Sequence, residues 1–252
     1  MLGKRVCAQV EARGIPVVGF GHSRDIANGT HVVDALAQAQ PKDVVINCAG
    51  LIPLRGSPAI DEIATNALGP HVIGAVCRAK NLRMVQVSTD CVFNGNKSGV
   101  KGRLKTPDAV DLYGRTKAIG EVGDLIIRTS FVGPEHGLWQ EVFAATGPLY
   151  GYTDWLWSGS TVWDVAASVV DVALSNKRGI VHLATKEPIS KFAVVSILNR
   201  MADTRPPVKV VSVGGDQTGW NDRSMKPNVV LRPFEEAMLG WYQRDRSDPC
   251  WT

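Results

Sequence analysis

A tyrosine and a lysine four residues apart, Tyr113 and Lys117 in the run YGRTK, are the residues of this sequence best suited to acid–base chemistry. On a helix this spacing places both side chains on one face, so the ammonium group favours the ionised phenol and moves its pKa toward neutrality. Ser88 and Thr89 stand at the end of an apolar run and can supply a hydroxyl group to a carbonyl oxygen. Because negative charge develops on that oxygen as hydride arrives, this set predicts reduction of a carbonyl group.

Each of these residues also has an ordinary structural interpretation. A tyrosine and a lysine at this spacing are frequent on solvated helices, and Ser88 and Thr89 could simply cap a helix or turn. For Asp90 we favour the capping role. The functional interpretation gains specificity because the pair follows the run STDCVFNG (88–95) and the strand end NCAG (47–50).

The elements that must position these residues alternate between short apolar runs and longer segments with helical spacing. Such alternation predicts an α/β fold, a Rossmann-like doubly wound parallel sheet covered by helices. The expected strands are residues 15–20, 43–48, 83–87, 125–128 and 180–184. The expected helices are residues 32–40, 60–80, 112–122 and 161–176. Ligands in such sheets bind outside the carboxyl ends of the strands, where we expect Thr89, Tyr113 and Lys117 to converge.

The opening run MLGKRVCAQVEARG resembles a helix that follows a glycine-rich turn. In dinucleotide-binding folds that turn joins the first strand to a helix whose N-terminus approaches the pyrophosphate. Gly3 would be the last glycine of such a turn. We therefore expect the first strand and the rest of the turn to be truncated, through a misplaced start codon or a shortened chain.

The C-terminal third changes character, since prolines interrupt the alternation and tryptophans cluster before and within it. We expect a small substrate-binding lobe here. The expected dinucleotide-binding domain is residues 1–132 and 161–184, and the expected lobe is residues 133–160 and 185–252.

Composition excludes several classes of protein. The 28 Lys and Arg residues exceed the 24 Asp and Glu residues only slightly and are scattered, so no nucleic-acid partner is predicted. The five cysteines are odd in number and far apart, and the five histidines lack metal-ligand spacing, which predicts reduced thiols and no metal. Without an apolar stretch that could span a bilayer, we expect no membrane association and a cytoplasmic location.

The sequence resembles the extended short-chain dehydrogenases/reductases, and most closely the dTDP-4-dehydrorhamnose reductase branch. The resemblance rests on INCAGLIP, STDCVFNG, YGRTKAIGE, IIRTSFVGP and GYTDWLWSGSTVWDVA, and it covers nearly the whole chain. It implies that Thr89, Tyr113 and Lys117 form a catalytic trio, with NADP(H) or NAD(H) as cofactor and a nucleotide-linked keto sugar as substrate. It also implies that Lys117 holds the nicotinamide ribose and that the cofactor lies along Asn47, Ala49 and Gly50.

Further binding residues follow from position and from the resemblance. His22, Ser23 and Arg24 follow the second expected strand, where Arg24 could pair with the 2′-phosphate of NADPH, although such an arginine is more often solvated. Trp155 and Trp157 could stack on a base or sugar, or belong to the core. Arg223 resembles a residue that reaches the nucleotide diphosphate, with a surface salt bridge as its alternative.

Alternatives remain open. Nucleotide-sugar dehydratases carry an acidic residue directly after Thr-Asp, where this chain has Cys91, so water elimination is not expected. An epimerase uses the same trio. A non-catalytic binding or regulatory protein on the same scaffold, resembling the regulatory subunit of methionine adenosyltransferase, would suit the missing glycine turn. A homodimer is also left open.

Overall fold

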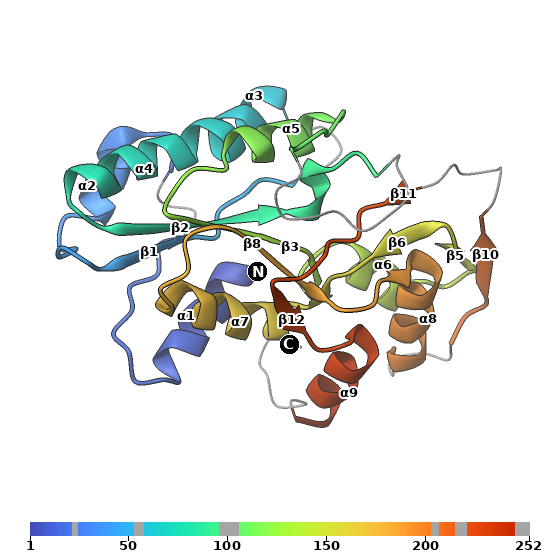
Figure 1. Ribbon diagram of the computed structural model, residues 1–252. Coiled ribbons are helices and arrows are strands. Elements are labelled where there is room, and N and C mark those ends of the chain that lie inside the picture. The colour runs from blue at the N-terminus through green and yellow to red at the C-terminus, as the bar shows by residue number, and fades with distance from the viewer. Residues whose placement is uncertain (22–24, 53–57, 96–105, 203–206, 215–220, 245–252) are drawn as a thin grey trace.

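The central element of the computed structural model is a five-stranded parallel sheet (Figure 1). The structure describes residues 1–21, 25–52, 58–95, 106–202, 207–214 and 221–244. The strand order is β1-β2-β3-β8-β12. The bounds are Val44–Asn47 for β1, Arg83–Thr89 for β2, Leu125–Thr129 for β3, Gly179–Thr185 for β8 and Val229–Leu231 for β12. The central strands β2 and β3 are almost wholly buried, as their continuous apolar runs predict.

Helices cover both faces of the sheet (Figure 1). One face is covered by α1 (Leu2–Glu11) and α7 (Val162–Leu174), which pack against each other. The other face is covered by α2 (Gly29–Ala35), α3 (Ala59–Glu62), α4 (Gly69–Ala79) and α5 (Leu112–Ile119). The larger core forms where valines of α7 meet β2, β3 and β8. The predicted doubly wound fold is therefore confirmed.

The strand expected at residues 15–20 is wrong. These residues form no helix or strand, although Ile15 and Val17 still pack against the larger core. In the part of the chain that the structure describes, β1 is the edge of the sheet, and its partner is β2. An extended run needs a neighbouring ladder to pair its backbone groups, and Val18 and Phe20 are instead exposed.

A π-helical segment, Ile63–Leu68, interrupts the long helix expected at residues 60–80. Within it, the buried Asn66 accepts a hydrogen bond from the Leu51 backbone amide and donates one to the Leu51 carbonyl, each at 2.8 Å. Asn66 thereby fixes the loop that follows β1. Gly120 at the end of α5 packs so closely that a Cβ there would lie 2.1 Å from the Asn66 carbonyl oxygen.

A smaller lobe lies beside the carboxyl ends of β2 and β3 (Figure 1). It holds the parallel pair β5 (Leu149–Tyr152) and β10 (Val210–Val213), and the sheet of β6 (Trp155–Trp157), β9 (Ile189–Ser190) and β11 (Asn221–Asp222). Its helices are α6 (Leu138–Phe143), α8 (Lys191–Met201) and α9 (Phe234–Arg244). A short parallel pair is formed by β4 (Phe131–Val132) and β7 (Ser160–Thr161). In the sequence, these two strands flank the first segment of the lobe.

A second apolar core supports this lobe. Trp139 contacts Phe143, Trp163 and Trp241 through stacked and edge-to-face geometry, and aliphatic residues of α8 surround this group. Within the range expected for the lobe, β12 joins the main sheet by pairing with β8. The two expected domains are therefore interleaved at the C-terminal end of the described chain.

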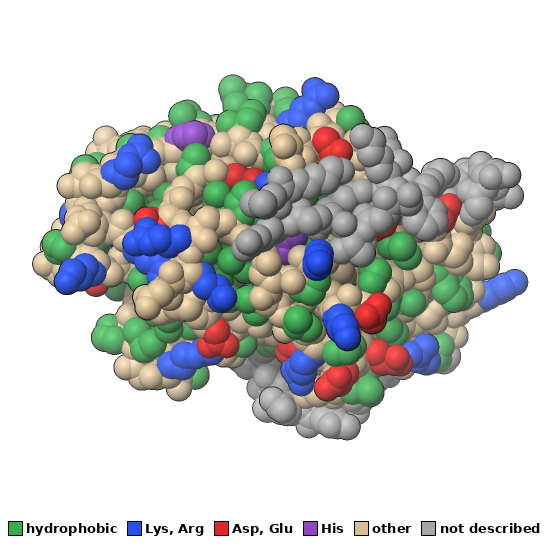
Figure 2. All heavy atoms as spheres, in the orientation of Figure 1, with side chains coloured by type: hydrophobic (Ala, Val, Ile, Leu, Met, Phe, Trp, Pro, Cys, Tyr) green, Lys and Arg blue, Asp and Glu red, His purple; other side chains and the backbone are tan. Residues whose placement is uncertain are grey.

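On the face seen in Figure 2, Lys and Arg side chains are spread among Asp and Glu rather than gathered into a stripe. None of the helices in the described ranges is long and apolar enough to cross a membrane. Within those same ranges, no cluster of His, Cys, Asp and Glu could hold a metal ion.

Candidate functional site

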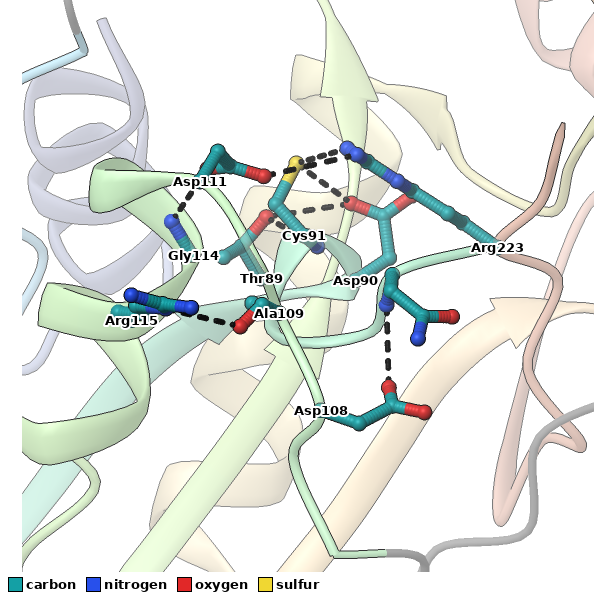
Figure 3. Close-up of polar contacts among 10 residues, drawn as sticks. Thr89, Asp90, Cys91, Asp108, Ala109, Asp111, Gly114, Arg115 and Arg223 are labelled. Carbon is teal, nitrogen blue, oxygen red and sulfur yellow. Dashed lines mark hydrogen bonds and ion pairs between the residues drawn. The ribbon is translucent and has the colours of Figure 1, made fainter. Parts of the chain in front are cut away.

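The site is built on the carboxyl end of β2, where the buried strand finishes at Thr89 and a single 3-10 turn, Asp90–Val92, begins. The Thr89 hydroxyl oxygen accepts a hydrogen bond from the Cys91 amide at 3.2 Å and so caps this turn. The same hydroxyl donates to Asp90 Oδ1 at 3.1 Å (Figure 3). Thr89 thus combines the capping role with a position at the sheet edge where ligands bind in such folds.

Helix α5 brings Tyr113 to Thr89. It begins at Asp111, whose carboxylate accepts a hydrogen bond from the Gly114 amide at 2.8 Å (Figure 3). Gly114 packs directly on the 3-10 turn, since a Cβ there would lie 2.2 Å from the Cys91 carbonyl oxygen. This contact seats the start of α5 against the end of β2, where the Thr89 hydroxyl acts to lower the pKa of the Tyr113 phenol.

The expected lowering of the Tyr113 pKa is wrong. Burial raises the pKa of Tyr113 well above its ordinary value, nearby Cys91 and Asp90 raise it further, and the Thr89 hydrogen bond lowers it only in part. Lys117 donates from Nζ to the Val87 carbonyl oxygen at 3.0 Å. The Tyr113 phenol therefore keeps its proton throughout the neutral range.

Lys117 is buried between α5 and the strand ends, with 6% of its surface exposed. A Cβ on Gly50 would lie 3.4 Å from its Nζ. Burial lowers the pKa of Lys117 to about 8, while Cys48, Glu121 and Cys91 act in the opposite direction. The ammonium group thus lies next to the loop after β1.

Replacing Lys117 with Met is expected to stabilise the fold while damaging turnover and cofactor binding. A shift from 10.5 to about 8 corresponds to about 3 kcal/mol of destabilisation when both states are protonated. The variant also loses the hydrogen bond to Val87, which costs it about 1 kcal/mol. Lys117→Met should therefore be about 2 kcal/mol more stable than the wild type at neutral pH. Between pH 8 and 10.5 the unfolded wild-type chain holds more protons than the folded chain, so the stability of the wild type rises with pH. The difference in stability between the wild type and Lys117→Met therefore disappears across this range.

Urea unfolding of both proteins at neutral pH and within that alkaline window measures this gap. Lys4→Met, a change at an exposed lysine of α1, is the matched control, and its difference in stability from the wild type should not change between neutral and alkaline pH. A Lys117→Met protein less stable than wild type at neutral pH would contradict the proposed burial cost.

The residues predicted to line the cofactor gather around the end of β1. Asn47 is buried, donates to Gln86 Oε1 at 2.8 Å and accepts from the Ala49 amide at 3.0 Å, so its side chain shapes the turn. Gly3 faces the same turn, because a Cβ on it would lie 3.6 Å from Cys48 Cβ. His22, Ser23 and Arg24 lie outside the described residues.

Ser88 points away from Thr89, as neighbouring residues of a strand do. It is buried, and its hydroxyl donates to Glu121 Oε1 at 2.7 Å. Glu121 also accepts from Arg128 Nε at 2.7 Å and from Arg128 Nη2 at 2.6 Å, forming a two-point ion pair. Ser88 therefore belongs to the interface between α5 and the sheet, which corrects its predicted contact with substrate.

The two predicted stacking tryptophans have different surroundings. Trp157 donates from Nε1 to Ser130 Oγ at 2.8 Å and packs edge-to-face on Phe234, so it joins the lobe to the end of β3. Trp155 stacks on Tyr152 with ring centroids 4.3 Å apart. Both of these stacked rings line a hollow of about 420 Å³, together with Leu138, Glu141, Val142, Pro148, Leu149, Tyr150, Lys191 and Val195.

Arg223 reaches from the lobe to the 3-10 turn (Figure 3). Its Nη1 lies 3.1 Å from Cys91 Sγ and its Nη2 lies 3.7 Å from Asp111 Oδ2. The salt bridge weighed for this residue is therefore present, and it places the guanidinium group beside the start of α5.

Sequence reasoning missed Asp111, Ser130 and Asn66 as residues of this site. Asp111 carries a readable signal, since an aspartate three residues before a helical glycine suits an N-cap. Ser130 and Asn66 carry none, because their partners Trp157 and Leu51 are 27 and 15 residues away in the chain.

Comparisons with known proteins agree with this architecture. The family model described as "RmlD substrate binding domain" matches residues 1–218. A probable low-salt glycan biosynthesis reductase of Haloferax volcanii is 30% identical over 71% of this chain and 63% of its own length. A dTDP-4-keto-6-deoxy-D-glucose reductase of Streptomyces niveus is 32% identical over 55% of this chain and 51% of its own. The chain thus spans between half and two thirds of these two curated relatives.

Solved structures show the same fold at low sequence identity. A dTDP-4-dehydrorhamnose reductase of Clostridium acetobutylicum superposes with a TM-score of 0.84 at 20% identity, covering 96% of this chain and 95% of the other. The corresponding enzyme of Bacillus anthracis, solved in complex with NADP, gives 0.83 at 18% identity, covering 97% and 95%.

Proposed function

Because the chain belongs to the RmlD substrate binding domain family, we propose that it reduces a keto group, with C4 favoured, on a nucleotide-linked deoxysugar. NADPH or NADH is the proposed hydride donor. The observation that carries this proposal is the half-buried Tyr113 phenol, whose pKa is affected by Thr89 at the carboxyl end of β2 and which lies one helical turn before Lys117. The relatives named as reductases of dTDP-linked keto sugars support the substrate class.

The residues at the end of β1 suit the nicotinamide end of the cofactor. Gly50 leaves open the space beside Lys117 and Asn66 that a Cβ would narrow to about van der Waals contact. Ala49 and Gly3 are also small, so backbone can approach a flat ring and its ribose closely. Lys117 would hold the ribose, while the preference for NADPH over NADH rests on Arg24 and stays a prediction.

When bound, the nicotinamide supplies hydride to the carbonyl carbon. The carbon–oxygen π electrons then move to the oxygen, where the Thr89 hydroxyl stabilises the developing charge. Tyr113 transfers its phenolic proton to that oxygen and becomes a phenolate. Lys117 favours this phenolate through its positive charge. The raised pKa of Tyr113 suits this direction of reaction, since the donor is loaded with a proton at neutral pH.

The lobe would bind the nucleotide part of the substrate. The hollow at Trp155 and Tyr152 offers an aromatic surface for a base or sugar ring, whereas Trp157 is engaged with Ser130. Arg223 offers two terminal nitrogens to a diphosphate, in exchange for its contacts with Cys91 and Asp111.

The described cysteines Cys7, Cys48, Cys77 and Cys91 are free thiols, which fits the proposed cytoplasmic location. A homodimer stays a prediction.

The test is a turnover assay with dTDP-4-keto-6-deoxyglucose, following the absorbance of the reduced nicotinamide. We expect one cofactor to be oxidised for each keto sugar consumed. An epimerase would convert the sugar without consuming added reduced cofactor, and a binding protein would bind both ligands without turnover. Either result would overturn the reductase proposal.

A further inference from the structure

Asp90 is a buried carboxyl group at the centre of the site, with 4% of its surface exposed. Its Oδ1 lies 3.1 Å from Thr89 Oγ1 and 3.6 Å from Cys91 Sγ (Figure 3). The Ser130 hydroxyl is a third hydrogen-bond partner. The carboxyl group does not cap the 3-10 turn as predicted, because Thr89 does so. Asp90 therefore needs another explanation.

The explanation follows from counting protons at Thr89. A hydroxyl group has one hydrogen to donate and two lone pairs that accept. One lone pair takes the Cys91 amide, which leaves one lone pair and the single hydrogen for other partners. If Asp90 is ionised it can only accept, so the single Thr89 hydrogen points to Asp90 Oδ1. Thr89 then has no hydrogen free for a substrate oxygen.

We propose that Asp90 is a positioning residue that, when it carries a proton, donates to Thr89 Oγ1 and turns the Thr89 hydrogen toward the reacting oxygen. In this state Thr89 Oγ1 accepts from the Cys91 amide and from Asp90, so its own hydrogen is free for the substrate oxygen. The catalytic part of this inference rests on the proposed reduction. The proton arrangement itself concerns only residues of this chain.

The surroundings of Asp90 raise its pKa on balance. Burial raises the pKa of Asp90 and is the largest effect; the Arg223 guanidinium and the hydrogen bonds from Thr89, Ser130 and Cys91 oppose it. From α5, Tyr113 and Asp111 also face this cluster. Arg223 is the cationic side chain among these groups, and it arrives from the lobe just after β11.

The first test needs no substrate. Side-chain carboxyl NMR of aspartate-labelled protein, assigned with Asp90→Asn, should show Asp90 titrating above an ordinary aspartate. The Thr89 methyl signal should shift with the same midpoint, because its hydroxyl changes direction there. Arg223→Gln should raise the midpoint by about 1 unit or more. Asp61→Asn, an exposed change on α3, should leave all of these signals in place.

An Asp90 that titrates at or below the ordinary range, or a Thr89 methyl that ignores its midpoint, would overturn the proposal. Both readings are independent of turnover, so they stand even if the protein reduces no sugar. If the wild type showed no turnover but gave the expected NMR titration, only the proposed function would be contradicted.

The second test uses turnover. Wild-type kcat should fall about tenfold for each pH unit above the Asp90 midpoint, as the protonated fraction falls. Asp90→Asn keeps a neutral donor at this position and should lose that limb while keeping the KM for cofactor. Asp90→Ala, which offers no donor, should lower kcat at all pH values. A merely structural role for Asp90 would leave the pH limb in Asp90→Asn unchanged, and that result would overturn the proposal.

Discussion

Tyr113→Phe is expected to lower turnover at least about a hundredfold, the loss typical of a missing general acid. The phenylalanine ring fills the same half-buried space, so the fold and the contacts of α5 should persist. What disappears is the phenolic proton proposed to move to the substrate oxygen. Because burial raises the pKa of Tyr113, the loss should be similar across the neutral range rather than confined to one pH.

Steady-state kinetics and calorimetry of nucleotide-sugar binding together test this prediction. Binding should survive in Tyr113→Phe, since the proposed contact area lies in the lobe. Thr89→Ser and Thr89→Val form a matched pair, of which only the first keeps the hydroxyl group and should keep most of the activity. Full turnover in Tyr113→Phe would show that the proton comes from another group, and the mechanism would have to be rebuilt.

The second large effect concerns stability. Glu121→Leu is expected to cost about 3–5 kcal/mol, because it leaves the Arg128 guanidinium buried without its carboxylate. Arg128 is 1% exposed and Glu121 is 7% exposed, so solvent cannot replace the lost charge. Ser88 would lose its acceptor in the same variant. Denaturant unfolding at neutral pH measures the difference.

Two further variants separate this ion pair from ordinary surface pairs. Glu235→Leu breaks the pair with Arg200, whose side chains are 55% and 57% exposed, and should cost less than about 1 kcal/mol. The double change Glu121→Leu with Arg128→Met should recover much of the lost stability, since it removes both buried charges. If the double variant were as unstable as Glu121→Leu, the penalty would arise from lost packing and not from an unpaired charge.

The strands near the site could be predicted because a short, continuous apolar run is typical of a strand that is buried on both faces of a sheet. Residues 125–128 and 180–184 read as buried strands and are found as β3 and β8 with nearly the same bounds. The run at 15–20 has comparable apolar character but forms no strand. A strand depends on its neighbour's backbone, and composition alone does not report whether that neighbour is present.

Some features of the site could likewise be predicted from the sequence, and others could not. Thr89 and Tyr113 could be brought together from sequence because strand ends and helix starts meet at one edge of a parallel sheet. Ser88 could not share that role, and strand alternation already says so, since adjacent side chains point to opposite faces. The direction of the Tyr113 pKa was beyond reach, because it depends on burial and on Cys91 and Asp90 across the site.

The close seating of α5 has a consequence for how this protein can diversify. At Gly114 and Gly120 the helix rests on backbone oxygens of Cys91 and Asn66, not on side chains that repack easily. The placement of the proton donor is therefore insensitive to ordinary substitutions in the surrounding core. The surface of the lobe proposed to face the substrate can accumulate changes, by natural drift or in a directed-evolution library, while the seating of α5 on β2 is inherited intact.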